Sequence, residues 1–161
     1  MAEMIKVGMA DLKLCISPNS ITTLGLGSCV GVAIRDTANK VGGLAHVMLP
    51  DSKEIKNNSN IAKFADTGVE ELVRQMEKAG ALRSRMVAKI AGGAQMFAMQ
   101  QNSALVKVGD RNVAAVKKKL AELKIPIRAE DTGLNYGRTV EFYPETGDYI
   151  IKAVGKPPKT I

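Results

Sequence analysis

The segment CVGVAIRDTANKVGGLAHVML, residues 29–49, contains two apolar runs joined by a short polar turn. In the first run Val30, Val32 and Ile34 alternate with smaller residues, which is typical of a β-strand. Residues 41–49 form the second apolar run, and the DTAN sequence between the two runs has turn composition. The segment therefore predicts two antiparallel strands joined as a hairpin.

Apolar residues recur at helical spacing in two later parts of the chain. The first stripe predicts a helix that starts near Ile61 and ends at Gly80, and the second predicts a helix with Asp110 as its N-cap. Short apolar runs predict further strands at residues 86–90, 125–129, 140–143 and 149–154. Strands that do not alternate strictly with the two main helices predict an α+β fold.

No linker or internal repeat divides the chain, so we expect one domain over residues 1–161. Residues 155–161, GKPPKTI, are expected to form a loose tail, because its two prolines pair poorly in a sheet. No apolar run is long enough to span a bilayer, and the N-terminus lacks the apolar stretch of a signal peptide. A cytoplasmic location without membrane insertion is the expectation.

Composition narrows the classes of function. The chain has 45% hydrophobic and 24% charged residues, a globular balance, and a net charge of +7. This excess suits an acidic protein partner. Nucleic-acid binding would rest on net charge alone, because aromatic residues make up only 4% and Trp is absent, so we expect no nucleic-acid partner. With a single histidine and no paired Cys/His motif, we expect neither a metal nor a cofactor.

The sequence TTLGLGSC, residues 22–29, places two glycines and a serine directly before a cysteine that begins a strand. Gly25 and Gly27 allow tight backbone turns, and with Ser28 they can direct successive N–H groups at one point, where an oxyanion would bind. The alternative is an ordinary entry into a strand, with Cys29 as a buried structural thiol. Cys15, in the alternating run LKLCI, is interpreted as a packing residue.

The one histidine, His46, lies on the partner strand of the predicted hairpin. A turn centred near residue 38 pairs positions whose numbers sum to about 76, which places Cys29 opposite roughly residue 47. An imidazole within reach of the thiol can take its proton and leave a nucleophilic thiolate. Taken alone, His46 is equally explained as a structural residue.

A Cys–His pair needs a third group to fix the imidazole ring. The hydroxyl of Thr23, six residues before Cys29 and on the predicted turn, is one candidate. Thr22, Ser28 and Asp51 are competitors that spacing does not separate. The glycine segments match neither a phosphate-binding loop nor a dinucleotide fingerprint.

Several motifs resemble the chemoreceptor glutamine deamidase family, CheD, in order from about residue 5 to residue 154. They are TLGLGSCVGV (23–32), AHVMLPDS (45–52), KFADT (63–67), AKIAGGAQMF (88–97), GDRN (109–112) and AEDTGLN (129–135). The resemblance implies that Cys29, His46 and Thr23 are the active-site residues. It also implies an α/β sandwich with a mostly antiparallel β core and the site at one edge, similar to the catalytic domains of deamidating bacterial toxins. Leu134 stands where the family has glycine, which questions the loop conformation there.

The activity that the resemblance implies is hydrolysis of selected glutamine side chains on the cytoplasmic helices of chemoreceptors, giving glutamate and ammonia. Attack by a cysteine thiolate on the carboxamide would leave a glutamyl thioester as the intermediate. Some relatives also remove methyl esters. The resemblance further implies a partner, the CheC phosphatase, which CheD binds and stimulates. Met96 and Phe97 are candidates for a partner contact, because Met and Phe suit adaptable surfaces, although both also suit a core. A binding module without catalysis is therefore the alternative function.

Overall fold

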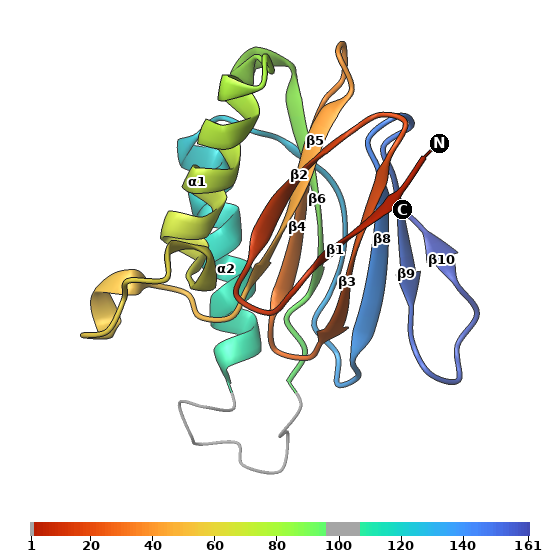
Figure 1. The fold of residues 1–161 in the computed structure, drawn as a ribbon. Coiled ribbons are helices and arrows are strands. Elements are labelled where there is room, and N and C mark those ends of the chain that lie inside the picture. The colour runs from red at the N-terminus through yellow and green to blue at the C-terminus, as the bar shows by residue number, and fades with distance from the viewer. Residues whose placement is uncertain (1, 96–106) are drawn as a thin grey trace.

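The computed structural model describes residues 2–95 and 107–161, and Figure 1 shows their arrangement. The helices are α1 (Ala65–Lys78) and α2 (Val108–Glu122). The strands are β1 (Met4–Val7), β2 (Leu12–Ile16), β3 (Ser20–Leu26), β4 (Val30–Asp36), β5 (Val41–Val47), β6 (Met86–Gly92), β7 (Ile127–Thr132), β8 (Arg138–Tyr143), β9 (Asp148–Lys152) and β10 (Lys159–Thr160). Short 3₁₀ turns occupy Ser52–Glu54, Ile61–Lys63 and Arg83–Arg85. The α+β prediction with two main helices is confirmed.

The strands form two sheets stacked face to face. The central sheet has the order β2-β5-β4-β6-β7, and the outer sheet has the order β1-β3-β8-β9-β10. Both helices cover the face of the central sheet that points away from the outer sheet (Figure 1). The pairs β1–β3 and β6–β7 are parallel and the other pairs among the described strands are antiparallel. The predicted mostly antiparallel core is therefore confirmed.

The predicted hairpin is the β4–β5 pair at the middle of the central sheet. Its register pairs Val30 with Val47 and Gly31 with His46, one residue from the pairing estimated from the turn position. The strand β6 lies along the other side of β4 and completes its hydrogen bonding. Every residue of β5 is buried, as expected for a strand covered on both faces.

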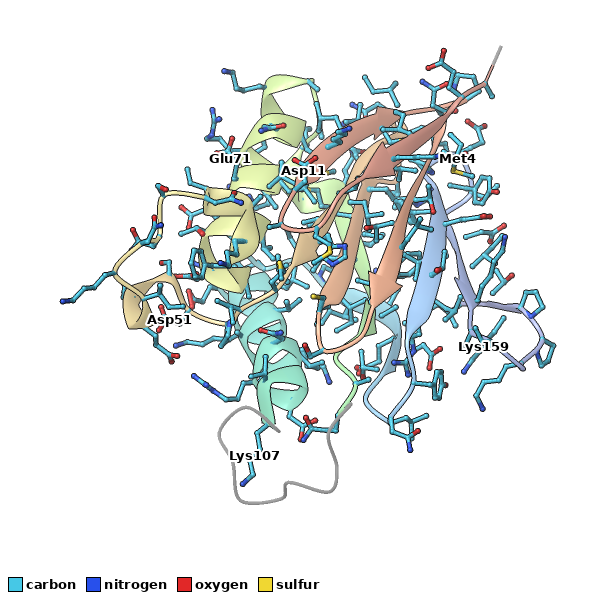
Figure 2. All side chains as sticks on the ribbon, turned by 60° about the horizontal axis from the view of Figure 1, so that its bottom comes forward. Met4, Asp11, Asp51, Glu71, Lys107 and Lys159 are labelled. Carbon is cyan, nitrogen blue, oxygen red and sulfur yellow. The ribbon has the colours of Figure 1, made fainter. Side chains whose placement is uncertain are left out.

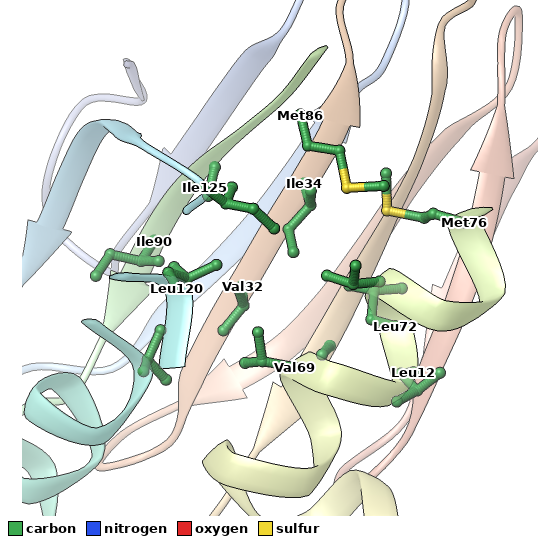
Figure 3. Packing of buried hydrophobic residues seen from close by; sticks show 14 of the residues in the cluster. Leu12, Val32, Ile34, Val69, Leu72, Met76, Met86, Ile90, Leu120 and Ile125 are labelled. Atoms are coloured by element: carbon green, nitrogen blue, oxygen red, sulfur yellow. The ribbon is translucent and has the colours of Figure 1, made fainter. Parts of the chain in front are cut away.

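Alternation along β4 separates two hydrophobic cores. Val30, Val32 and Ile34 point to the helices, where α1 and α2 contribute buried residues that include Val69 and Leu120 (Figure 3). The smaller residues between them point to the outer sheet and face a second cluster. The two cores place the central sheet in the interior, so side chains on either of its faces are removed from water.

A glycine at the centre of β4 permits the close approach of the two sheets. The hydroxyl of Tyr149 on β9 donates a hydrogen bond of 2.8 Å to the carbonyl of Gly31. A Cβ atom at residue 31 would lie 2.7 Å from that same hydroxyl oxygen. The outer sheet therefore packs directly on the backbone of β4 at Gly31, the residue that is paired with His46 on β5.

The end of α1 agrees with its prediction, whereas the start of α2 differs from its prediction. Gly80, with φ of +104°, follows α1 as predicted. The helix α2 begins at Val108, so the prediction of Asp110 as N-cap was wrong, and Asp110 lies in the first turn. Gly109 is needed inside the helix, because a Cβ there would lie 2.4 Å from the carbonyl oxygen of Ala94.

The C-terminal residues are ordered, contrary to the expectation of a loose tail. The prolines lie before β10, which pairs with the edge strand β9. The backbone of Ile161 then exchanges two hydrogen bonds with Tyr149, and the ammonium of Lys89 donates to the Ile161 carbonyl at 2.7 Å. In the described ranges, no helix is long and apolar enough to cross a membrane.

Candidate active site

The nucleophile candidate lies at the end of the molecule where β3 ends and β4 begins, at the bottom of Figure 1. Figure 2 brings this end forward. Cys29 is the last residue of the turn 27–29, and its side chain belongs to the core between the two sheets. It keeps 9% of its surface exposed, against 1% for Cys15, which lies in the same core. Cys29 is thus the thiol at the rim of this core.

The hairpin register places His46 on the same face as Cys29. Residues paired across two strands point to the same side of a sheet, and His46 is paired with Gly31. Residues two apart along a strand also share a face, so Cys29 and His46 are diagonal neighbours that both face the outer sheet. His46 itself is fully buried.

Thr23 reaches the imidazole from the opposite sheet. The prediction placed Thr23 on the turn before Cys29, and this is wrong: Thr23 lies within β3 of the outer sheet, where it pairs with Val7 and Val140. Its hydroxyl oxygen is 2.7 Å from Nδ1 of His46 and 2.8 Å from the carbonyl oxygen of Val7. The sheet-forming preference of a β-branched residue accounts for the strand in place of the turn.

The two contacts of this hydroxyl fix the tautomer of the ring. A hydroxyl carries one proton, and the Val7 carbonyl can only accept one, so the Thr23 proton is directed to Val7. Nδ1 of His46 must then carry a proton and donate it to Thr23. Nε2 is left as the unprotonated nitrogen, and it is buried with no hydrogen-bond partner among the described residues.

Burial keeps both members of the pair neutral at rest. It raises the pKa of the Cys29 thiol above its ordinary value, although the backbone at Cys29 opposes this through a hydrogen bond. Burial also lowers the pKa of the His46 imidazole. A neutral imidazole with a free Nε2 can accept a proton, so this nitrogen is suited to act as a general base towards the neighbouring thiol.

The other candidates for the third group make no hydrogen bond to the imidazole in the part of the chain that the structure describes. The hydroxyl of Thr22 donates to the carbonyl of Val140 at 2.7 Å. The carboxylate of Asp51 accepts from the N–H of Lys53 and caps a 3₁₀ turn. Ser28 lies on the turn and is tied through its carbonyl. Among these residues, Thr23 is the one that the structure places on the imidazole.

The turn before Cys29 is held by its carbonyl groups. Ala94 N–H donates to the Gly27 carbonyl at 2.9 Å, and Gly93 N–H donates to the Cys29 carbonyl at 2.8 Å. The side-chain amide of Asn112 donates to the Ser28 carbonyl at 2.9 Å. In a trans peptide the N–H points opposite to the carbonyl, so the N–H groups of Ser28 and Cys29 face away from these anchors.

The glycines have distinct parts in this turn. Gly25 has a φ of +70° and lies where the β3–β8 register shifts, so it ends the regular strand. Gly92, the last residue of β6 and the partner of Val30, has a φ of +108°, and a Cβ there would lie 2.2 Å from the carbonyl oxygen of Cys29. Sequence reasoning missed Gly92 and Asn112, although the glycine pair at the end of a predicted strand was a usable signal.

Two further expectations bear on binding groups. Met96 and Phe97, the candidates for a partner contact, lie outside the described residues. Across residues 2–95 and 107–161, no group of three or more His, Cys, Asp or Glu side chains could hold a metal ion.

A thiol and an imidazole on the same face of a sheet, with the second ring nitrogen bonded to a hydroxyl, form an arrangement that occurs in cysteine-dependent hydrolases and acyl transferases. Comparison with known proteins defines the family. A family model described as "CheD chemotactic sensory transduction" matches residues 48–153. This chain belongs to the CheD family.

The similarity to curated relatives extends over the whole length. A protein of Lachnoclostridium phytofermentans named "Probable chemoreceptor glutamine deamidase CheD" is 65% identical over 161 residues, covering 100% of both chains. One of Halalkalibacterium halodurans named "Chemoreceptor glutamine deamidase CheD" is 51% identical over 162 residues, again covering 100% of both. A third, "Probable chemoreceptor glutamine deamidase CheD" of Caldanaerobacter subterraneus, is 52% identical over 160 residues and 99% of each chain.

Proposed function

We propose that this protein is a cysteine hydrolase that deamidates selected glutamine side chains of chemoreceptors, with Cys29, His46 and Thr23 as its catalytic residues. The observation that carries the proposal is the orientation and tautomer of the His46 imidazole. Thr23 fixes Nδ1 as the protonated nitrogen, and Nε2 is left free on the face that His46 shares with Cys29. The names of relatives of equal length support the substrate.

The first half of the reaction forms a thioester. Nε2 of His46 takes the thiol proton as the sulfur of Cys29 attacks the carboxamide carbon of the glutamine. The N–H groups of Ser28 and Cys29, which face away from their anchored carbonyls, hold the oxyanion. The C–N bond then breaks, and the imidazolium gives its proton to the departing nitrogen, because an amide nitrogen leaves poorly unless protonated. Ammonia is released.

The second half restores the thiol. Nε2 of the neutral imidazole accepts a proton from water, which attacks the thioester carbonyl in the same oxyanion site. The C–S bond breaks, the sulfur recovers the proton from the imidazolium, and a glutamate side chain remains on the receptor. The hydroxyl of Thr23 accepts a hydrogen bond from Nδ1–H throughout and so keeps the ring in the productive orientation. A methyl ester at the same position could follow the same route, with methanol as the leaving group.

The remaining parts of the proposal concern place and partners. The substrate is a chemoreceptor cytoplasmic helix, so the protein acts in the cytoplasm. The CheC phosphatase is a further partner, which the CheD resemblance implies. We propose no cofactor and no nucleic-acid partner.

The test is mass spectrometry of a receptor cytoplasmic fragment after incubation with the protein in heavy-oxygen water. We expect one glutamine or more to become glutamate, a gain of about one dalton before the label is counted, with oxygen from the solvent in the new carboxylate. Cys29→Ala and His46→Gln should abolish this change. Thr23→Val, which removes the hydroxyl at equal size, should lower kcat about 100-fold, and Thr23→Ser should restore most of it.

A Cys29→Ala preparation that still deamidates the fragment would exclude the catalytic proposal. The same variant separates the two functions, because a binding role does not need the thiol. If the variant still stimulates the CheC phosphatase while deamidation is lost, both functions belong to this chain.

A further inference from the structure

Asn112 is a fully buried amide on α2 that the mechanism above does not use. It lies on the buried stripe of the helix with Gly109, Val116 and Leu120. Its side-chain nitrogen Nδ2 donates to two carbonyl oxygens, that of Ser28 at 2.9 Å and that of Met48 at 2.9 Å. Both partners are acceptors, so the nitrogen and not the oxygen must face them.

These two carbonyls belong to the segments that carry the thiol and the imidazole. Ser28 directly precedes Cys29, and Met48 follows His46 by two residues. The last pair of the β4–β5 ladder at this end is Val30 with Val47. Ser28 and Met48 thus lie just beyond the ladder, where strand pairing no longer fixes the distance between the two segments. The amide of Asn112 spans this open end.

The environment of the Asn112 side chain indicates that its nitrogen, as a hydrogen-bond donor, is the atom that the site requires. Oδ1 of Asn112 is buried and has no hydrogen-bond partner among the described residues. A buried unpaired acceptor costs free energy that an apolar side chain of similar size would avoid. The pair of hydrogen bonds that Nδ2 donates is therefore the contribution of this residue that packing alone does not explain.

We propose that Asn112 is a positioning residue that holds Cys29 in register with His46, by clasping the nucleophile turn and the end of β5 to helix α2. The proposal rests on the function proposed above. The turn has other anchors, the N–H groups of Gly93 and Ala94, but these bind Gly27 and Cys29 and have no link to β5. Asn112 is the side chain that joins both segments.

The first measurement is the rate at which iodoacetamide alkylates Cys29 as a function of pH, followed by peptide mapping. Cys15 is 1% exposed and its thiol pKa is raised by burial to about 11, so labelling of the folded protein reports Cys29. In the unmodified protein, His46 should accelerate labelling near pH 7, and His46→Gln should remove the acceleration. Asn112→Ala and Asn112→Asp should give the profile of His46→Gln, with labelling at pH 7 slower by about tenfold.

The second measurement is the steady-state rate on a receptor fragment. A positioning role predicts that Asn112→Ala lowers kcat and leaves KM unchanged, because the amide contacts neither substrate nor reacting atoms. If Asn112→Asp does not fold, because its carboxylate opposes two carbonyl oxygens, Asn112→Ser supplies the second variant. Its hydroxyl is too short to span both carbonyls, so it should show the same loss of acceleration.

The matched control is Lys89→Met. Lys89 also donates from one nitrogen to two carbonyls, Gly147 and Ile161 at 2.7 Å each, in a part of the fold that holds no proposed site residue. Its loss should lower stability and leave the alkylation profile and kcat unchanged. Wild-type profiles in folded Asn112→Ala and Asn112→Ser would overturn the inference. If instead His46→Gln itself left the Cys29 profile unchanged, the proposed function would fail first.

Discussion

At the scale of single residues, the proposed chemistry depends on the one histidine of the chain. His46 is fully buried, and burial lowers its pKa below the ordinary value. Among the described residues, the polar side chain that the structure places on the ring is Thr23, which accepts from Nδ1. A buried imidazole with a neutral partner gains nothing from becoming charged, so the folded state favours the neutral form.

This preference predicts a pH dependence of stability that can be assigned to one residue. The unfolded chain takes up a proton on His46 at its ordinary pKa of about 6.5, whereas the folded chain resists protonation to lower pH. The unfolded state therefore binds more protons below that value, and the free energy of unfolding should fall as the pH decreases from about 6.5 to 5. Urea denaturation at several pH values measures it.

The control for this prediction is His46→Gln, in which the slope over the same pH range should become flatter. A carboxylate such as Asp36 does not contribute to the slope in this pH range. Its pKa is lowered by its hydrogen bond to Arg85, so its contribution to the free energy of unfolding is lost only at more acidic pH. If the free energy of unfolding had the same pH slope in both proteins, protonation of His46 would not destabilise the folded state.

The residues of the proposed site could be named from the sequence, but their geometry was only partly predictable. Cys29 and His46 could be paired from a turn position, because hairpin register is a local property. Thr23 was named for its hydroxyl and placed on the wrong element, since its position depends on how the outer sheet docks. Asn112 lies in the GDRN motif, but its role could not be predicted from it, because its contacts arise from packing between α2 and two separate loops.

At the scale of elements, the loop between β7 and β8 contains a backbone conformation that its sequence disfavours. Leu134 has a φ of +61° and is 63% exposed. The sequence motif there had suggested glycine. An L-residue with a side chain pays about 1–2 kcal/mol to adopt the left-handed region, whereas glycine does so freely. The exposed leucine side chain offsets little of this cost through burial.

Leu134→Gly should therefore stabilise the fold, by about 0.5–1 kcal/mol, because the relief of strain exceeds the added chain entropy of the unfolded state. Guanidinium denaturation measures the change. Leu134→Ala, which keeps a Cβ, is the matched control and should leave stability nearly unchanged. A less stable glycine variant would mean that the leucine side chain contributes contacts that outweigh the strain.

Elements with strong local patterns were predicted well, and those defined by distant partners were not. The β4–β5 hairpin and the end of α1 follow from alternation and a glycine stop. The start of α2 was displaced, because its first turn is selected by close packing of Gly109 on the backbone after β6. The short strand β10 was missed altogether, since two residues have no pattern of their own and order by pairing with β9.

At the scale of the whole molecule, the contact between the two sheets defines the site as much as any single element does. The outer sheet approaches β4 at Gly31, where Tyr149 fills the space that a side chain would need. Gly31 is also the residue paired with His46. The spacing of the sheets and the position of the imidazole are therefore coupled at one point.

Gly31→Ala should test this coupling. The added methyl would overlap the Tyr149 hydroxyl, so we expect a loss of stability of about 1–3 kcal/mol and a lower kcat in the folded fraction. Gly8→Ala is the control, because a Cβ there meets nothing within 4 Å, and it should be neutral in both measurements. Full activity in Gly31→Ala would show that the sheets tolerate a wider spacing without disturbing the imidazole.

The contact of Thr23 with His46 crosses from one sheet to the other, and this has a consequence for how the chain matures. A nascent or damaged molecule in which the outer sheet has come away keeps its thiol, but its imidazole no longer has a neighbour to select the tautomer. In such a molecule the Cys29 thiol would react slowly. On the proposed mechanism, full reactivity of Cys29 therefore requires the two sheets to be in contact.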